Sequence, residues 1–289
     1  MITRRRFFTL SACALACRAT AAPMVWEGRV LGADARLDLR GPKELTQGVL
    51  DHLRVVLHDI ENAVSLYQAS ALVQLNHTGQ LQQAPQILCD LLRLSRRIHA
   101  ATNGAFDPTV QRLWQALARG DDPRHAAATI GLDRVTQDAR SITLDRGQAL
   151  TFNGVAQGFA ADRVRALLQD AGFETGLVNM GEFAALGGPF RLGMEGPQGQ
   201  IGTLTLSNSA CATSTPSALF LAQQSHILGP QGQSPRWSSV TVEAKSAALA
   251  DACSTAFCLM REPDIDAARK ALDLTRVFLV APNGDLRRL

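Results

Sequence analysis

Apolar residues recur every three or four positions along several stretches of the chain, which is the spacing of one buried helix face. The clearest helix is predicted over residues 43–64, where the apolar positions are Leu45, Val49, Leu53, Val56 and Ile60. Further helices are predicted near residues 86–100, 157–171 and 246–260. Short runs rich in apolar and β-branched residues predict strands near residues 25–40, 175–179, 190–194, 203–207, 239–243 and 276–281.

The order of these elements predicts the fold class. Helices and strands alternate, but not in the regular strand–helix–strand repeat that builds a parallel sheet. We therefore expect an α+β fold, in which helices pack on a mainly antiparallel sheet. The length of the chain allows one large or two small domains, and no linker-like segment decides between them.

Composition and charge exclude several classes of protein. The chain is 46% hydrophobic and 19% charged, values typical of a globular protein and not of a disordered chain or a coiled coil. No stretch approaches the roughly 18 consecutive apolar residues that cross a bilayer. The formal net charge of +3 comes from Arg4, Arg5, Arg6 and Arg18, since the rest of the chain carries slightly more acids than bases. A nucleic-acid-binding function is therefore not expected.

Residues 1–21 have the pattern of a bacterial export signal. Consecutive arginines at positions 4–6 precede an apolar segment, and Ala19–Ala21 forms a small-x-small cleavage site. This order is typical of the twin-arginine route, so we expect the protein in the periplasm. Cys13 also ends a lipoprotein-like motif, but cleavage there would leave an apolar region shorter than the roughly 7–15 residues that are usual. A soluble form is therefore favoured over a lipid-anchored one.

Four cysteines remain after the export signal, namely Cys89, Cys211, Cys253 and Cys258. In an oxidising compartment an even number permits disulfides, but a chain of this length can be held together by its core. Buried free thiols are therefore the favoured interpretation. The sequence contains no CxxC motif after the export signal, and we expect no metal bound by these thiols.

A loop with two glycines runs directly into the helix predicted near residues 157–171. Gly154 and Gly158 would let the backbone approach a phosphate group, and the helix N-terminus favours an anion. The spacing matches neither a dinucleotide-binding loop nor a P-loop, so the glycines could equally shape a turn. The sequence leaves both interpretations open.

A carboxylate and a hydroxyl share one face of the helix predicted near residues 246–260. Asp251 and Thr255 are four residues apart on a segment that is otherwise almost wholly apolar. Such an oxygen pair suits a hard cation such as Mg²⁺. In the alternative interpretation Thr255 bonds the backbone carbonyl of Asp251, and Asp251 faces water. The cost of burying an unpaired acid favours the cation ligand.

Two further segments bear on the chemistry. Thr102–Val110 is a polar turn after a helix, and Ser65–Leu72 holds the only tyrosine of the chain, Tyr67. Tyr67 is either an ordinary half-buried aromatic residue or a platform on which a planar ring can stack.

Together these segments resemble the ApbE family of FAD:protein FMN transferases. The family patterns Ser-x-Tyr, T-x-G-A-F-D-P-T-V, G-x-A-K-G-Y-A-x-D and A-L-A-D-A-x-S-T correspond to Ser65–Tyr67, Thr102–Val110, Gly154–Asp162 and Ala248–Thr255. Cys211–Ser214 and Ser225–Ile227 resemble a further A-T-S and S-H-I pair. Five motifs in the family's order, over about residues 60–260, are hard to produce by chance.

The resemblance implies a fold and a function. Residues 22–289 would form a single flavin transferase domain that moves FMN from its substrate FAD onto a threonine hydroxyl of an acceptor flavoprotein facing the periplasm, with Mg²⁺ bound and AMP released. The implied Mg²⁺ ligands are Asp251, Thr255 and the backbone carbonyl of Ala160. The implied FAD-binding residues are Tyr67, Ala105, Phe106, Asp107, Gln157, Arg163 and His226. Either His226 or Asp251 would accept the proton of the attacking hydroxyl.

The chain departs from the family pattern at three places. Gln157 stands where the family usually has a lysine, which removes a positive charge from the phosphate site. Gly229 replaces the aspartate of H-I-x-D-P, and Asn179–Glu182 has one glycine fewer than usual. The Asn-Gly-x-Ala-Gln-Gly form and the twin-arginine signal are similar to the branch associated with nitrous-oxide reductase maturation. The acceptor of that branch would be a membrane-bound electron-transfer protein.

Two other functions would use the same residues. A Mg²⁺-dependent FAD pyrophosphatase would transfer FMN to water, and a catalytically inactive FAD-binding or maturation protein would bind FAD without turnover. The retained pair of Asp251 and Thr255 argues against the inactive protein.

Overall fold

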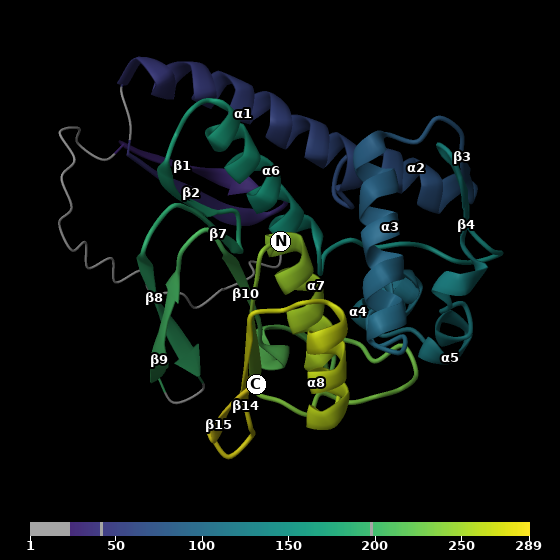
Figure 1. Cartoon of the computed structure of the whole chain (residues 1–289). Coiled ribbons are helices and arrows are strands. Elements are labelled where there is room, and N and C mark those ends of the chain that lie inside the picture. Colours follow the sequence, from purple (N-terminus) through teal and green to yellow (C-terminus); the bar gives the residue numbers. More distant parts are fainter. Residues whose placement is uncertain (1–23, 41–42, 197–198) are drawn as a thin grey trace.

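An antiparallel sheet of eight strands is the frame of the protein in its computed structural model, which describes residues 24–40, 43–196 and 199–289 (Figure 1). The strands lie in the order β1 (Met24–Val30), β2 (Ala33–Arg40), β6 (Thr175–Asn179), β7 (Phe183–Leu186), β10 (Ala210–Ser214), β13 (Ser239–Ala244), β14 (Arg276–Val280) and β15 (Leu286–Arg288). Each strand pairs antiparallel with its neighbours. The predicted export signal, residues 1–21, lies outside the described residues.

Helices cover one face of this sheet. α6 (Ala156–Asp170) packs against β7, α7 (Ala247–Phe257) packs against β10 and β13, and the two helices pack against each other. α1 (Lys43–Val64) lies on α6, and α3 (Gln86–Ala101) lies on α7. Apolar side chains of these helices and of alternate strand positions, such as Val178 and Val242, form the main core.

A hairpin covers part of the opposite face. It consists of β8 (Phe190–Gly196) and β9 (Gly199–Leu206), and its Leu192 and Leu204 belong to a second apolar cluster with Phe183 and Cys211 of the sheet. Successive strand residues point to opposite faces of a sheet. Because both faces are covered here, β7 and β13 are buried along their whole length.

The remaining elements of the described chain are short. α2 (Ala71–Thr78), α4 (Gln111–Arg119) and α5 (Pro123–Ala127) lie on the α3 side of the molecule (Figure 1). The short strands are β3 (Gln80–Leu81), β5 (Ser141–Thr143), β4 (Thr136–Asp138), β11 (Phe220–Leu221) and β12 (Gln224–Ser225). The 3-10 turns are η1 (Pro108–Val110), η2 (Leu132–Arg134) and η3 (Pro216–Ala218), and α8 (Glu262–Ala271) joins α7 to β14. Among the described residues, no helix combines the length and the apolar character needed to span a membrane.

The predicted α+β fold with a mainly antiparallel sheet is confirmed. Each predicted helix and strand is present, with boundaries shifted by a few residues. The sequence analysis missed the central strands β7 and β10. Both are short and rich in alanine, which has a low preference for strands. The expectation of buried free thiols is also confirmed, since Cys89, Cys211, Cys253 and Cys258 are all buried and none forms a disulfide.

Candidate functional site

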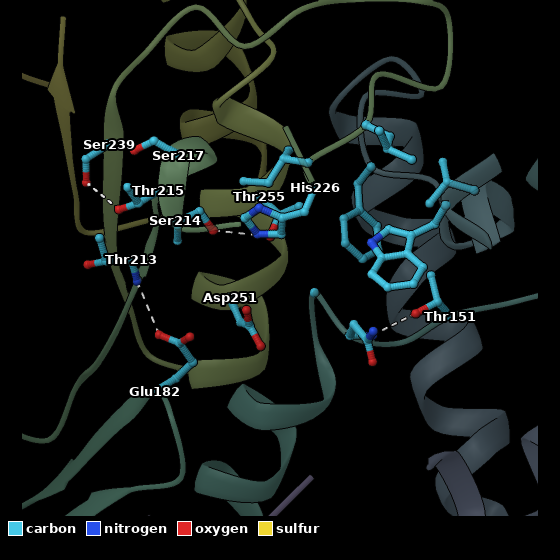
Figure 2. Close-up of a pocket in the computed structure, with 18 of the residues that line it drawn as sticks. Thr151, Glu182, Thr213, Ser214, Thr215, Ser217, His226, Ser239, Asp251 and Thr255 are labelled. Atoms are coloured by element: carbon cyan, nitrogen blue, oxygen red, sulfur yellow. Dashed lines mark hydrogen bonds between the residues drawn. The ribbon is translucent and has the colours of Figure 1, made fainter. Parts of the chain in front are cut away.

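A cavity of about 840 Å³ lies between the ends of β10 and β13, helix α7 and the segment that leads into α4 (Figure 2). Hydroxyl groups line one part of it, from Thr213, Ser214, Thr215, Ser217 and Ser239. Apolar side chains line another part, from Phe106, Pro108, Val110, Trp114, Ile227 and Leu228. In the view of Figure 2, Asp251 and Thr255 lie between the hydroxyl-bearing strands and Thr151. A cavity with separate polar and apolar walls is typical of sites for small molecules.

Asp251 and Thr255 come together at this cavity, as their spacing predicts. They occupy successive turns of α7 and both line the cavity. The Asp251 side chain is buried and its Oδ2 atom accepts a hydrogen bond of 3.0 Å from the N–H of Gly158. The Ser214 hydroxyl lies 3.2 Å from that of Thr255. The Asp251 side chain is buried, so the alternative interpretation, in which Asp251 faces water, does not describe this site. The carbonyl of Asp251 accepts a hydrogen bond from the Ser254 hydroxyl.

Gly154, just before α6, and Gly158, within it, lie in different surroundings. A Cβ atom on Gly158 would lie 2.2 Å from the carbonyl oxygen of Ala247, so only glycine allows α6 and α7 to approach this closely. Gly154 lines the cavity, and a Cβ atom there would lie 3.2 Å from the hydroxyl of Thr255. The N–H of Gly158 points to Asp251, so this part of the predicted phosphate loop is occupied by a protein carboxylate.

The turn at residues 102–110 is fixed by its own side chains. Asn103 and Gly104 adopt positive φ angles, and the hydroxyl of Thr102 accepts a hydrogen bond from the N–H of Phe106. Asp107 is buried and caps η1 by accepting hydrogen bonds from the N–H and the hydroxyl of Thr109, while its other oxygen accepts the N–H of Leu132. These bonds hold Ala105, Phe106 and Asp107 at the edge of the cavity, where the sequence analysis expected a ligand-binding segment.

His226 presents its ring to the cavity in a defined tautomer. Its Nδ1 atom lies 3.0 Å from the carbonyl oxygen of Leu219. A carbonyl oxygen only accepts, so Nδ1 donates and Nε2 is the atom of the neutral ring that can take up a proton. This arrangement suits a general base.

Four of the predicted site residues are not among the described residues that line the cavity. Ala160 and Gln157 are buried within α6, Arg163 is exposed on the same helix, and Tyr67 is 72% exposed. Their contacts with a ligand remain predictions. The structure does place Ala105, Phe106, Asp107, His226, Asp251 and Thr255 around one cavity.

Sequence reasoning assigned no role to several residues that the cavity includes. Trp114 follows the Thr102–Val110 turn by one helical turn, and Glu182 is the acid of the Asn179–Glu182 segment. Glu182 is buried and accepts the N–H of Thr213. The run of hydroxyl residues at positions 213–215 was the available signal for the polar wall, but its strand β10 was not predicted.

The electrostatics of the cavity are dominated by acids. Asp107, Glu182, Glu195 and Asp251 line it, and none of the described lining residues is lysine or arginine. A dianionic group would be repelled here unless a cation accompanied it. Within the part of the chain that the structure describes, no three His, Cys, Asp or Glu residues form a metal-binding group. A cation at Asp251 would therefore take hydroxyl, backbone and ligand oxygens as its further ligands.

Cys253 of α7 and Cys258, which directly follows that helix, are not candidates for a nucleophile. Burial raises the pKa of the Cys253 and Cys258 thiols far above their usual range, so both stay protonated. Burial also raises the pKa of the Cys211 thiol, and the negative charges of Glu182 and Glu243 raise it further.

The chain is similar to known proteins in sequence. The model of the ApbE family matches residues 31–278. A protein of Klebsiella pneumoniae named FAD:protein FMN transferase is 29% identical over 208 residues, and the match spans 65% of this chain and 65% of that protein's length.

Solved structures share the fold. The ApbE protein of Thermotoga maritima superposes with a TM-score of 0.82 at 22% identity, covering 92% of this chain and 97% of the other. The flavinyl transferase ApbE of Pseudomonas stutzeri gives a TM-score of 0.80 at 23% identity, covering 93% of this chain and 94% of the other. Because the family model covers most of the sequence, the chain belongs to the ApbE family.

Proposed function

We propose that the protein is an FAD:protein FMN transferase that attaches FMN to a threonine hydroxyl of an acceptor protein and releases AMP. The observation that carries this proposal is the composition of the cavity lining, which combines the oxygen pair of Asp251 and Thr255 with apolar side chains and an excess of acids. FAD offers two flat rings for the apolar wall and a pyrophosphate that needs a cation in acidic surroundings. The name of the K. pneumoniae relative supports the same activity.

The residues present fit a Mg²⁺ ion. Asp251 supplies a buried carboxylate, Thr255 a hydroxyl on the same helix face, and both meet the hard-cation preference for oxygen. The family resemblance adds the carbonyl of Ala160, and Gly154 offers a second backbone candidate because it lies against Thr255. When bound, the ion would neutralise charge on the pyrophosphate and on the departing AMP.

We assign the binding and orientation of the substrate to the other residues of the cavity. Phe106 and Trp114 would hold a planar ring, and the hydroxyls of Thr213, Ser214 and Thr215 would bond the polar linker of the substrate. His226 would take the proton of the threonine hydroxyl at Nε2, because its Nδ1 atom is held by the carbonyl of Leu219. Asp251 is less suited to this task, since its carboxylate already accepts the N–H of Gly158.

The setting of the reaction is proposed from the sequence. The twin-arginine pattern of residues 1–21 supports export to the periplasm, with a mature domain of residues 22–289. The acceptor would then be a flavoprotein that faces the periplasm. The loop form around Gln157 supports a membrane-bound electron-transfer protein of nitrous-oxide reduction as that acceptor.

An assay of AMP release tests this function. Purified protein is incubated with FAD and Mg²⁺, with and without candidate acceptor domains, and AMP is quantified by chromatography. AMP release that requires the acceptor is expected for a transferase. Equal release of AMP and free FMN without any acceptor would instead identify an FAD pyrophosphatase.

A further inference from the structure

Helices α6 and α7 cap each other with carboxylates. Asp162, in the second turn of α6, accepts the N–H of Ala247 at 2.9 Å and the N–H of Ala248 at 3.0 Å, both at the start of α7. Asp251 of α7 accepts the N–H of Gly158 in the first turn of α6. A carboxylate is the preferred partner for the N–H groups of a first turn, because these groups have no acceptor within their own helix.

Neither helix is capped by its own residues alone. The N-cap residue of α6 is Val155, whose side chain forms no capping bond. The N-cap of α7 is Ser246, whose hydroxyl accepts the N–H of Leu249 and also donates to Asp162 at 2.6 Å. The start of α7 is therefore held by a group on α6, and the start of α6 by the candidate metal ligand on α7.

Further contacts fix Asp162 itself. Its Oδ1 atom is 2.9 Å from the Arg165 guanidinium, and Arg165 also donates to the carbonyl of Lys245, just before α7. Both side chains are about four-fifths buried, with exposures of 20% and 19%. Gly158 lets the two helices approach to direct contact at Ala247. Asp162 and Gly158 together therefore fix how α6 and α7 pack against each other.

We propose that Asp162 is a positioning residue for the metal site. By holding the first turn of α7 it sets where Asp251 and Thr255 lie relative to Gly154 and Ser214, which come from other elements. The inference rests on the proposed function, because it takes Asp251 and Thr255 as the ligands of the ion. Asp162 lies outside the cavity lining, and it would nevertheless contribute to the affinity for that ion.

Binding of Mn²⁺ to the purified full protein, followed by electron paramagnetic resonance, tests this role without any reaction. Mn²⁺ takes the same kinds of oxygen ligands as Mg²⁺. Groups that orient metal ligands typically contribute about tenfold or more to metal affinity. We expect Asp162→Ala to raise the dissociation constant for Mn²⁺ about tenfold, and Asp162→Asn to have a smaller effect because its amide oxygen still accepts a hydrogen bond.

Two further variants separate a positioning role of Asp162 from a general loss of stability. Asp122→Ala removes the side-chain cap of α5, outside the cavity lining, and is expected to bind Mn²⁺ like the wild type. Ser246→Ala removes the hydroxyl that joins α7 to Asp162 and is expected to weaken Mn²⁺ binding, so the proposal stays testable if the Asp162 variants do not fold.

The outcomes are distinct. A folded Asp162→Ala protein with wild-type affinity for Mn²⁺ would overturn the role of Asp162, and so would an equal loss of affinity in Asp122→Ala. A wild-type protein that does not bind Mn²⁺ would overturn the metal site itself, and with it the Mg²⁺ part of the proposed function.

Discussion

Asp251 meets two requirements with one side chain. As a buried carboxylate it needs a hydrogen-bond donor, which the N–H of Gly158 supplies, and as a cavity residue it is the acid of the proposed cation site. Removing the side chain altogether would change both the helix cap and the site. An isosteric amide separates them, because asparagine still accepts the N–H of Gly158 but carries no charge.

We predict that Asp251→Asn lowers the rate of AMP release about 100-fold or more, the scale seen when one group that stabilises developing charge is lost. The free energy of unfolding should change by less than about 1 kcal/mol, since the cap remains. Rates and thermal unfolding are measured on the same preparation, with Asp266→Asn on the surface of α8 as the control. Near wild-type turnover would remove Asp251 from the mechanism.

The two aromatic candidates for ring binding differ in their surroundings. Trp114 lines the cavity and is half-buried, whereas Tyr67 is largely exposed. We predict that Trp114→Ala weakens FAD binding by about 1–3 kcal/mol, the scale of aromatic stacking on a base. Tyr67→Ala, measured by the same calorimetry, tests the stacking role that the family resemblance implies. Phe220→Ala, an exposed aromatic residue outside the cavity lining, should leave the FAD affinity unchanged.

At the scale of elements, the crossing of α6 and α7 explains a motif that the sequence left open. The second glycine of the loop is required by contact between helices, because its Cβ atom would meet the carbonyl oxygen of Ala247. We predict that Gly158→Ala costs about 1–3 kcal/mol of unfolding free energy, as overpacking does, and lowers the affinity for Mn²⁺. Urea denaturation measures the first effect.

Gly48→Ala is the matched control for this substitution. Gly48 is an exposed residue inside α1, and a Cβ atom there would meet nothing within 4 Å. Alanine should therefore stabilise the protein by up to about 1 kcal/mol, since it has the higher helix propensity. A Gly158→Ala protein as stable as the Gly48→Ala protein would contradict the close contact.

The elements that could be predicted were those with a strong local pattern. The apolar period of α1 and the β-branched run of β13 are visible in the sequence, so both were located correctly. The strands β7 and β10 are short and rich in alanine, and β10 becomes a strand through pairing with β7 and β13, which lie far from it along the chain. No local pattern reports such pairing, so the hydroxyl wall carried by β10 was not predicted.

At the scale of the molecule, the site is assembled from segments that are distant in sequence. Helical spacing was enough to predict that Asp251 and Thr255 lie together, because both are on α7. It could not predict that Trp114 and Glu182 would line the same cavity, since each comes from a different element. The capping bond between Asp162 and α7 joins residues 85 apart, so only the packed structure reveals it.

The acidic lining of the cavity leads to a prediction for the whole binding reaction. With Asp107, Glu182, Glu195 and Asp251 around it, a pyrophosphate should bind poorly without a divalent cation. We predict that replacing Mg²⁺ with excess EDTA weakens FAD binding about tenfold, or about 1.4 kcal/mol, and that FAD binds more tightly than FMN in the presence of Mg²⁺. Equal affinities for FAD and FMN in calorimetry would argue against a pyrophosphate site.

The mass of an acceptor domain after reaction tests the central claim most directly. The purified protein is mixed with FAD, Mg²⁺ and an acceptor flavoprotein domain, and the intact acceptor is weighed by mass spectrometry. We predict that the acceptor gains the mass of one FMN attached to a threonine, and that Asp251→Asn protein or excess EDTA prevents the gain. An unmodified acceptor under conditions in which FAD is consumed, or full modification in excess EDTA, would contradict the account.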